Sequence, residues 1–73
     1  MAIVAIRTEI AGSVWKVLAK VGQTVAEEEP ILLLESMKME IPVAASEAGT
    51  VEEILVEEGD VVTEGAIVAR LKV

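Results

Sequence analysis

Short apolar runs, separated by glycine and proline, organise the whole sequence. The runs are rich in Val, Ile and Leu, and residues that favour turns bound them, which predicts β-strands rather than helices. In the last run the apolar and charged positions alternate, with Leu71 and Val73 on one face and Arg70 and Lys72 on the other. The six clearest predicted strands cover residues 3–8, 13–20, 31–36, 39–44, 50–57 and 66–73.

Residues 50–59 also fit an amphipathic helix. Three apolar residues have helical spacing there, and Thr50 with Glu53 matches a capping box. The related segment 13–22 has three valines and a tryptophan and lacks the glutamate that the box needs. If both segments share one conformation, a strand is favoured, with a bulge that absorbs the broken alternation.

An internal repeat relates the two halves of the chain. Ala11-Gly12-Ser13-Val14 returns as Ala48-Gly49-Thr50-Val51, and Gly22 returns as Gly59 at the same offset. Two similar halves of four strands each predict an all-β fold, in which two four-stranded antiparallel sheets pack around an aliphatic core. If a pseudo-two-fold axis relates the halves, the chain midpoint and the two termini lie at opposite ends.

Composition limits what this chain does. Its 73 residues make one small domain, 1–73. We expect its single aromatic residue, Trp15, in the core, and the less favoured alternative is that Trp15 is exposed and binds a partner. The absence of cysteine and histidine excludes thiol chemistry and a histidine base. A net charge of −7 opposes binding to nucleic acid or anionic lipid, and no apolar stretch is long enough to span a membrane. We expect a monomeric cytoplasmic protein that is not an enzyme.

The acidic run Glu27-Glu28-Glu29 has two interpretations. A solvated acidic turn is favoured over a site for a hard cation. Glu28 stands where the second half has Gly65, so the first half must form this turn without the conformational freedom of glycine.

Lys38 lies near the chain midpoint, in the segment Glu35-Ser36-Met37-Lys38-Met39-Glu40. The flanking strands require a tight hairpin centred on Met37 and Lys38. Two-residue hairpin turns favour Asn, Asp or Gly, so these residues break a local folding rule, which is a mark of functional positions. An exposed tip does not suit a desolvated Schiff-base lysine. It suits an amine that another enzyme must reach and modify.

This segment resembles the biotin attachment site of biotin-dependent carboxylases and decarboxylases, and the glycine-anchored repeat resembles the same domains over the whole chain. The resemblance implies a flattened barrel-sandwich fold and a carrier function. A biotin protein ligase would attach biotin covalently to Lys38, and the carrier would serve biotin carboxylase and carboxyltransferase sites in trans. Met37 and Met39 are the motif flanks, and the resemblance makes Glu35, Ser36 and Glu40 candidates for ligase recognition.

Two alternatives to this hypothesis stay open, and so does the role of the flanking methionines. Lipoyl domains usually place Asp before the lysine and Ala after it, but Glu35 and Gly22 match their spacing, so lipoate on Lys38 is a second candidate. The other alternative is that Lys38 is not modified and that the chain is a β-module used for binding or assembly. Met37 and Met39 either contact the ligase or lie partly on the core. Ser36 departs from the commonest motif, which has Ala at that position.

Overall fold

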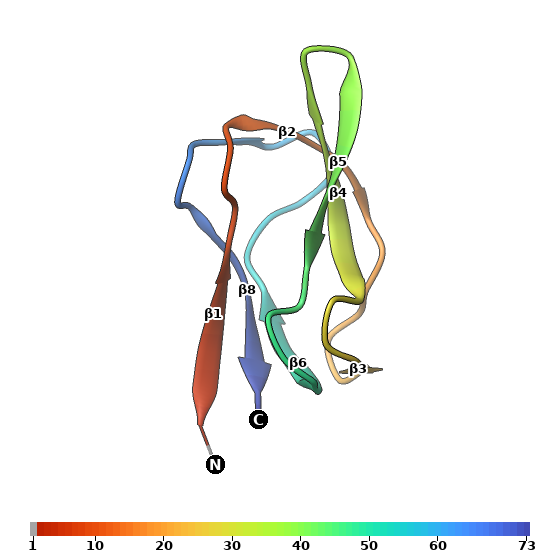
Figure 1. The fold of residues 1–73 in the computed structure, drawn as a ribbon, viewed down its shortest axis with the longest axis vertical. Helices are drawn as coiled ribbons and strands as arrows, with labels where there is room; N and C mark the ends of the chain where they lie inside the picture. The colour runs from red at the N-terminus through yellow and green to blue at the C-terminus, as the bar shows by residue number, and fades with distance from the viewer. Residues whose placement is uncertain (1) are drawn as a thin grey trace.

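The computed structural model describes residues 2–73 and confirms the predicted fold class (Figure 1). Two four-stranded antiparallel sheets have the strand orders β1-β8-β6-β3 and β5-β4-β2-β7, so each takes two strands from each half of the chain. None of the described residues forms a helix long and apolar enough to cross a membrane. The strands are β1 (Ile3–Arg7), β2 (Gly12–Val17), β3 (Thr24–Val25), β4 (Pro30–Ser36), β5 (Met39–Ala44), β6 (Gly49–Ile54), β7 (Val61–Val62) and β8 (Ile67–Lys72).

The segment that was open to a helical interpretation is a strand. It forms β6, which pairs with β8, and the predicted bulge lies between Val51 and Glu53. The first half has the matching bulge in β2, between Val14 and Lys16. Both strands end earlier than the apolar pattern predicted, because the chain leaves the sheet soon after each bulge. The two related segments therefore share a strand conformation, as the internal repeat predicted.

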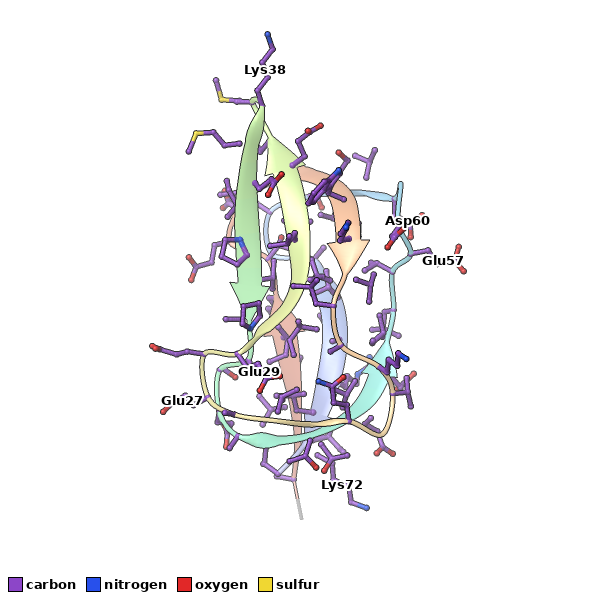
Figure 2. The ribbon with its side chains drawn as sticks, turned by 90° about the vertical axis from the view of Figure 1, so that its right-hand side faces the viewer. Glu27, Glu29, Lys38, Glu57, Asp60 and Lys72 are labelled. Carbon is purple, nitrogen blue, oxygen red and sulfur yellow. The ribbon has the colours of Figure 1, made fainter. Side chains whose placement is uncertain are left out.

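The two halves repeat one another down to individual hydrogen bonds. The Gly22 amide donates to the Val51 carbonyl, and the Gly59 amide donates to the Val14 carbonyl, both at 2.8 Å. The molecule measures 37 × 18 × 18 Å, and Lys38 and Lys72 lie at opposite ends (Figure 2). The predicted separation of the chain midpoint from the termini is confirmed.

The core between the sheets is aliphatic, as predicted. Its largest fully buried side chains are Ile31, Leu32, Leu34, Leu71, Val25, Val51 and Val68. The expectation that Trp15 belongs to this core is wrong, because 43% of the residue is exposed. The β2 bulge directs it outward, next to Lys16, whose Nζ lies 5.1 Å from the centroid of the indole ring.

Glycine is required where the chain passes close to another backbone. A Cβ on Gly12 would lie 2.7 Å from the carbonyl oxygen of Glu35, and one on Gly49 would lie equally close to that of Lys72. Gly12 thus lets β2 pass against the upper part of β4, just below the hairpin. The predicted turn at Glu28 is also confirmed, since its φ is 69° and that of Gly65 is 82°.

Candidate functional site

The hairpin between β4 and β5 holds Lys38 at its tip. Ser36 pairs with Met39, which leaves Met37 and Lys38 as the two central residues of the turn. Their φ angles are 52° and 66°, and positive φ at both positions is the pattern of a type I′ turn. The predicted tight hairpin is confirmed. The turn conformation costs free energy here, because side chains with a Cβ disfavour the left-handed region.

The Lys38 side chain is exposed and points away from the body of the domain (Figure 2). Within residues 2–73, one ion pair satisfies the usual distance limit, and it joins Arg70 to Glu53 at 3.0 Å on the sheet β1-β8-β6-β3. No carboxylate of the described residues therefore engages the Lys38 ammonium. The site offers an amine at the end of a flexible four-carbon chain, fixed at its base by the turn.

The two methionines that flank Lys38 do not lie on the core. Met37 is 92% exposed and Met39 is 63% exposed. Of the two interpretations of these residues, partial burial on the core is wrong. Both present flexible apolar surface to water beside the lysine. Exposed apolar side chains grouped in this way mark contact surfaces.

Glu35 and Glu40 lie directly opposite one another on the two strands, and both are exposed. Like charges placed directly across an antiparallel pair are destabilising. Their presence below the tip is therefore not explained by the needs of the fold. Ser36 is half-buried beside Gly12, whose added Cβ would lie 3.4 Å from the Ser36 Cβ. Recognition of these three residues by a ligase stays a prediction.

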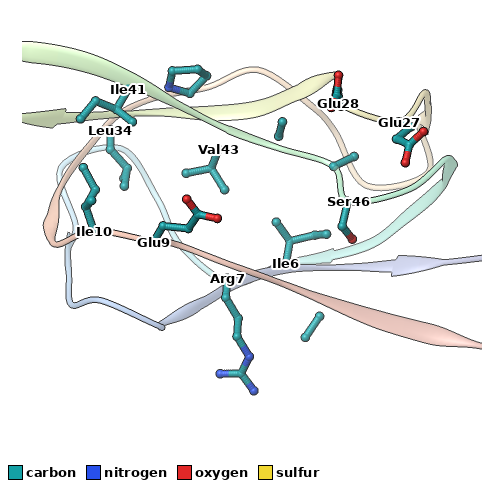
Figure 3. Close-up of a pocket in the computed structure, with 14 residues that line it drawn as sticks. Ile6, Arg7, Glu9, Ile10, Glu27, Glu28, Leu34, Ile41, Val43 and Ser46 are labelled. Atoms are coloured by element: carbon teal, nitrogen blue, oxygen red, sulfur yellow. The ribbon is translucent and has the colours of Figure 1, made fainter.

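A groove that the sequence did not reveal lies between β1 and β5 (Figure 3). It has a volume of about 450 Å³, an apolar lining that includes Ile6, Leu34 and Val43, and carboxylates from Glu9 and Glu28. Its two walls come from edge strands of different sheets, far apart in the sequence, so no local pattern indicates it. None of residues 35–40 lines it. The groove is thus separate from the lysine tip.

The acidic run forms a turn in which the Glu29 carboxylate accepts two hydrogen bonds from nearby residues. Glu29 Oε1 accepts a hydrogen bond from the Ala26 amide at 3.0 Å, and Oε2 accepts one from Gln23 Nε2 at 3.4 Å. In the part of the chain that the structure describes, no group of three or more acidic side chains is arranged to hold a metal ion.

Comparison with known proteins shows the family to which this chain belongs. The family model described as "Biotin-requiring enzyme" matches residues 2–71, and the chain belongs to this biotin/lipoyl-attachment family. It is 43% identical over 63 residues to the biotin/lipoyl attachment protein of Bacillus subtilis, with 86% of each chain covered. Further relatives include a biotin carboxyl carrier protein, a biotin-dependent acyl-coenzyme A carboxylase subunit and an acetyltransferase component of a pyruvate dehydrogenase complex.

Solved structures support the same assignment. The urea carboxylase of Kluyveromyces lactis matches with a TM-score of 0.93 and 33% identity over 99% of this chain and 6% of its own. The lipoyl domain of the 2-oxoglutarate dehydrogenase complex from Azotobacter vinelandii matches with a TM-score of 0.70 and 32% identity, covering 85% of this chain and 78% of that domain. Domains of this family are carriers of covalently attached biotin or lipoate.

The strained turn gives a first prediction. Replacing Met37 with Asn and Lys38 with Gly supplies the residues that a type I′ turn prefers, so the double variant should be more stable by about 1–2 kcal/mol. Urea unfolding followed by circular dichroism measures this difference. Met39→Asn, one residue outside the turn, is the control and should bring no gain. A double variant no more stable than the parent would show that the turn is unstrained.

Proposed function

We propose that this chain is a biotin carrier, that residues 1–73 act as one attachment domain, and that biotin is joined to Lys38. The observation that carries this proposal is an exposed amine at the apex of a two-residue turn, between two exposed methionines. The turn conformation is unfavourable for both residues that occupy it. Such a cost is expected where a position is kept for function rather than for stability.

The Lys38 amine supplies the nucleophile for attachment. A biotin protein ligase would present the biotin carboxyl group as an adenylate, and the neutral amine would form the amide bond as AMP leaves. The lysine then loses its charge, and its four-carbon chain becomes part of a flexible arm. Activation of the biotin carboxyl group belongs to the ligase and this chain supplies only the amine, so we infer that the chain is not itself an enzyme.

Attached biotin would accept a carboxyl group, and the domain would carry it from one enzyme site to the next. The arm would visit a biotin carboxylase site and then a carboxyltransferase site, both on other proteins. Tethering raises the effective concentration of a linked group at each site to about millimolar. The net charge of −7 gives the carrier an anionic surface, which slows self-association and favours partners with cationic docking surfaces. The cytoplasmic location and the monomeric state expected from the sequence stay predictions.

Lipoate on Lys38 is the second candidate function. The specific observation in its favour is the structural likeness to a lipoyl domain, with a TM-score of 0.70. Glu35, three residues before the lysine, and Gly22 are spaced as in lipoyl domains. The residues adjacent to Lys38 favour biotin instead, because lipoyl domains usually have Asp and Ala where this chain has Met37 and Met39.

Position in the fold gives the second prediction. With a purified biotin protein ligase, biotin and ATP, Lys38 should be the only modified lysine. Lys72 lies at the opposite end of the molecule (Figure 2), and Lys16 and Lys20 lie within and after β2 rather than in the hairpin. Intact mass should rise by one biotinyl group, and peptide mapping should place it on Lys38.

Lys38→Ala is the matched control for this prediction. It should abolish modification and change the free energy of unfolding by no more than about 0.5 kcal/mol, because an exposed side chain contributes little packing. Biotin on another lysine, or a loss of several kcal/mol in the Lys38→Ala variant, would contradict the proposed site.

The flanking methionines give the third prediction. Replacing Met37 with Asp and Met39 with Ala should shift modification from biotin towards lipoate. A ligase pocket that accepts an apolar Met37 would have to desolvate the charge of Asp at that position, which is costly. The test offers a biotin ligase and a lipoyl ligase, each with its cofactor and ATP, to both proteins and compares initial rates. An unchanged ratio of the two rates would show that recognition lies elsewhere on the domain.

A further inference from the structure

The outer face of the sheet β5-β4-β2-β7 carries apolar side chains at four positions. The inward residues Val14, Leu34, Val43 and Val62 are buried. Since strand residues alternate between faces, the residues between them or next to them point outward. We call this the lysine-side face, because β4 and β5 continue from it to the Lys38 hairpin; Figure 2 shows these strands side by side beneath Lys38. Its apolar residues are Trp15, Leu33, Pro42 and Val61.

The internal repeat provides a matched comparison for this face. The other sheet has the same strand arrangement, the same bulge and equivalent hydrogen bonds. At the equivalent positions, thirty-seven residues away in the sequence, it carries small, polar or charged side chains instead. Trp15 corresponds to Glu52, Leu33 to Arg70, Pro42 to Ala5 and Val61 to Thr24.

One cross-strand pair shows how different the two faces are. On the far sheet, Glu53 pairs with Arg70 across the strands and forms the 3.0 Å ion pair. On the lysine-side face the equivalent pair is Lys16 opposite Leu33. Lys16 is directed over the Trp15 ring, with Nζ 5.1 Å from the ring centroid. The same backbone thus holds an ion pair on one side and, on the other, a lysine that lies over a tryptophan ring and opposite a leucine.

The apolar residues of the lysine-side face are not required by the fold, because the far sheet forms the same backbone without them. Val61 is 81% exposed, so it contributes little burial within the domain, and Trp15, which is 43% exposed, presents part of its apolar surface to solvent. Tryptophan is enriched among the residues that dominate binding energy at interfaces, and clustered exposed apolar residues mark such interfaces. The face is therefore suited to a partner.

The position of the face relative to Lys38 identifies the partner. Leu33 lies five residues before Lys38, which is about 16 Å along an extended strand. A stable interface needs about 800 Å² from each partner, more than a two-residue turn offers. An enzyme that acts on the Lys38 amine must enclose the tip, and so it must also contact a surface continuous with the hairpin. An enzyme that uses the attached group meets it at the end of an extended arm and needs less of the domain.

We propose that the lysine-side face is the docking surface for the biotin protein ligase, with Trp15 as its central contact. This inference rests on the proposed function. The complementary ligase surface has an apolar centre that receives Trp15 and Val61. It has cationic residues towards the hairpin, where Glu35 and Glu40 lie opposite one another.

The test exchanges each residue for its counterpart on the far sheet. Trp15→Glu and Val61→Thr introduce side chains that the same backbone already holds at positions 52 and 24. Glu52→Ala and Thr24→Ala are the controls on the far face. Biotinylation of each full-length variant is followed by initial rates with purified ligase, biotin and ATP over a range of carrier concentrations. Urea unfolding and analytical ultracentrifugation verify the fold and the oligomeric state.

Trp15→Glu should raise the KM for the carrier about tenfold or more with little change in kcat, because it removes a central contact rather than the reacting amine. Val61→Thr should raise KM less, and the far-face controls should match the parent. If the parent is biotinylated and both exchanges leave KM unchanged, the docking surface is wrong while the proposed function stands. Equal losses in the far-face controls, or a dimer of the parent that Trp15→Glu dissociates, would also overturn it. A parent that the ligase does not modify would overturn both proposals.

Discussion

The pairing of β4 with β5, which runs without a register shift from Leu32 opposite Val43 to Ser36 opposite Met39, is the constraint on which the position of Lys38 depends. Once Glu35 is opposite Glu40 and Ser36 is opposite Met39, only two residues remain to reverse the chain. A two-residue connection between twisted antiparallel strands requires positive φ at both positions, whichever residues occupy them. The strands therefore impose the conformation on the turn. Fully buried residues of β4 such as Leu32 and Leu34 hold the pairing in register, because a shift by one residue would expose them.

The internal symmetry explains why Lys38 lies far from both ends of the chain. Equivalent strands of the two halves exchange between the sheets, so that β4 and β8 occupy corresponding places and run to opposite ends of the molecule. One end holds the hairpin and the other holds the termini. A carrier fused to other domains through its termini would keep the lysine free under this arrangement. The same symmetry makes each half a control for the other, which separates the needs of the fold from those of recognition.

Much of this could be predicted from the sequence because the signals were repeated or local. The glycine-anchored repeat predicted two equivalent halves, and it also resolved the helix-like pattern around Thr50 as a strand with a bulge. The violation of turn preferences at Met37 and Lys38 located the tip. The family resemblance rested on the same residues. In each case a backbone requirement left a direct trace in the residue types.

Other features depend on tertiary arrangement and left no such trace. Trp15 was expected in the core, and its exposure was the less favoured alternative. A bulge changes which face a side chain occupies, and the sequence did not show that Trp15 lies on the outer side of it. The burial of Met37 and Met39 was undecidable because it depends on how far the hairpin extends beyond the sheet. The groove between β1 and β5 arises only when two edge strands from different sheets come together.

The central claim is that the turn, and not exposure alone, presents the lysine. Exchanging Lys38 and Met39, by Lys38→Met with Met39→Lys, moves the amine by one residue into β5 and keeps the composition of the segment. The decisive measurement is the initial rate of biotinylation of this variant beside the parent. Because misplacement of a reacting group by even an ångström can cost about a hundredfold, the account predicts a loss of that order. An undiminished rate would contradict it and show that any exposed lysine near the tip suffices.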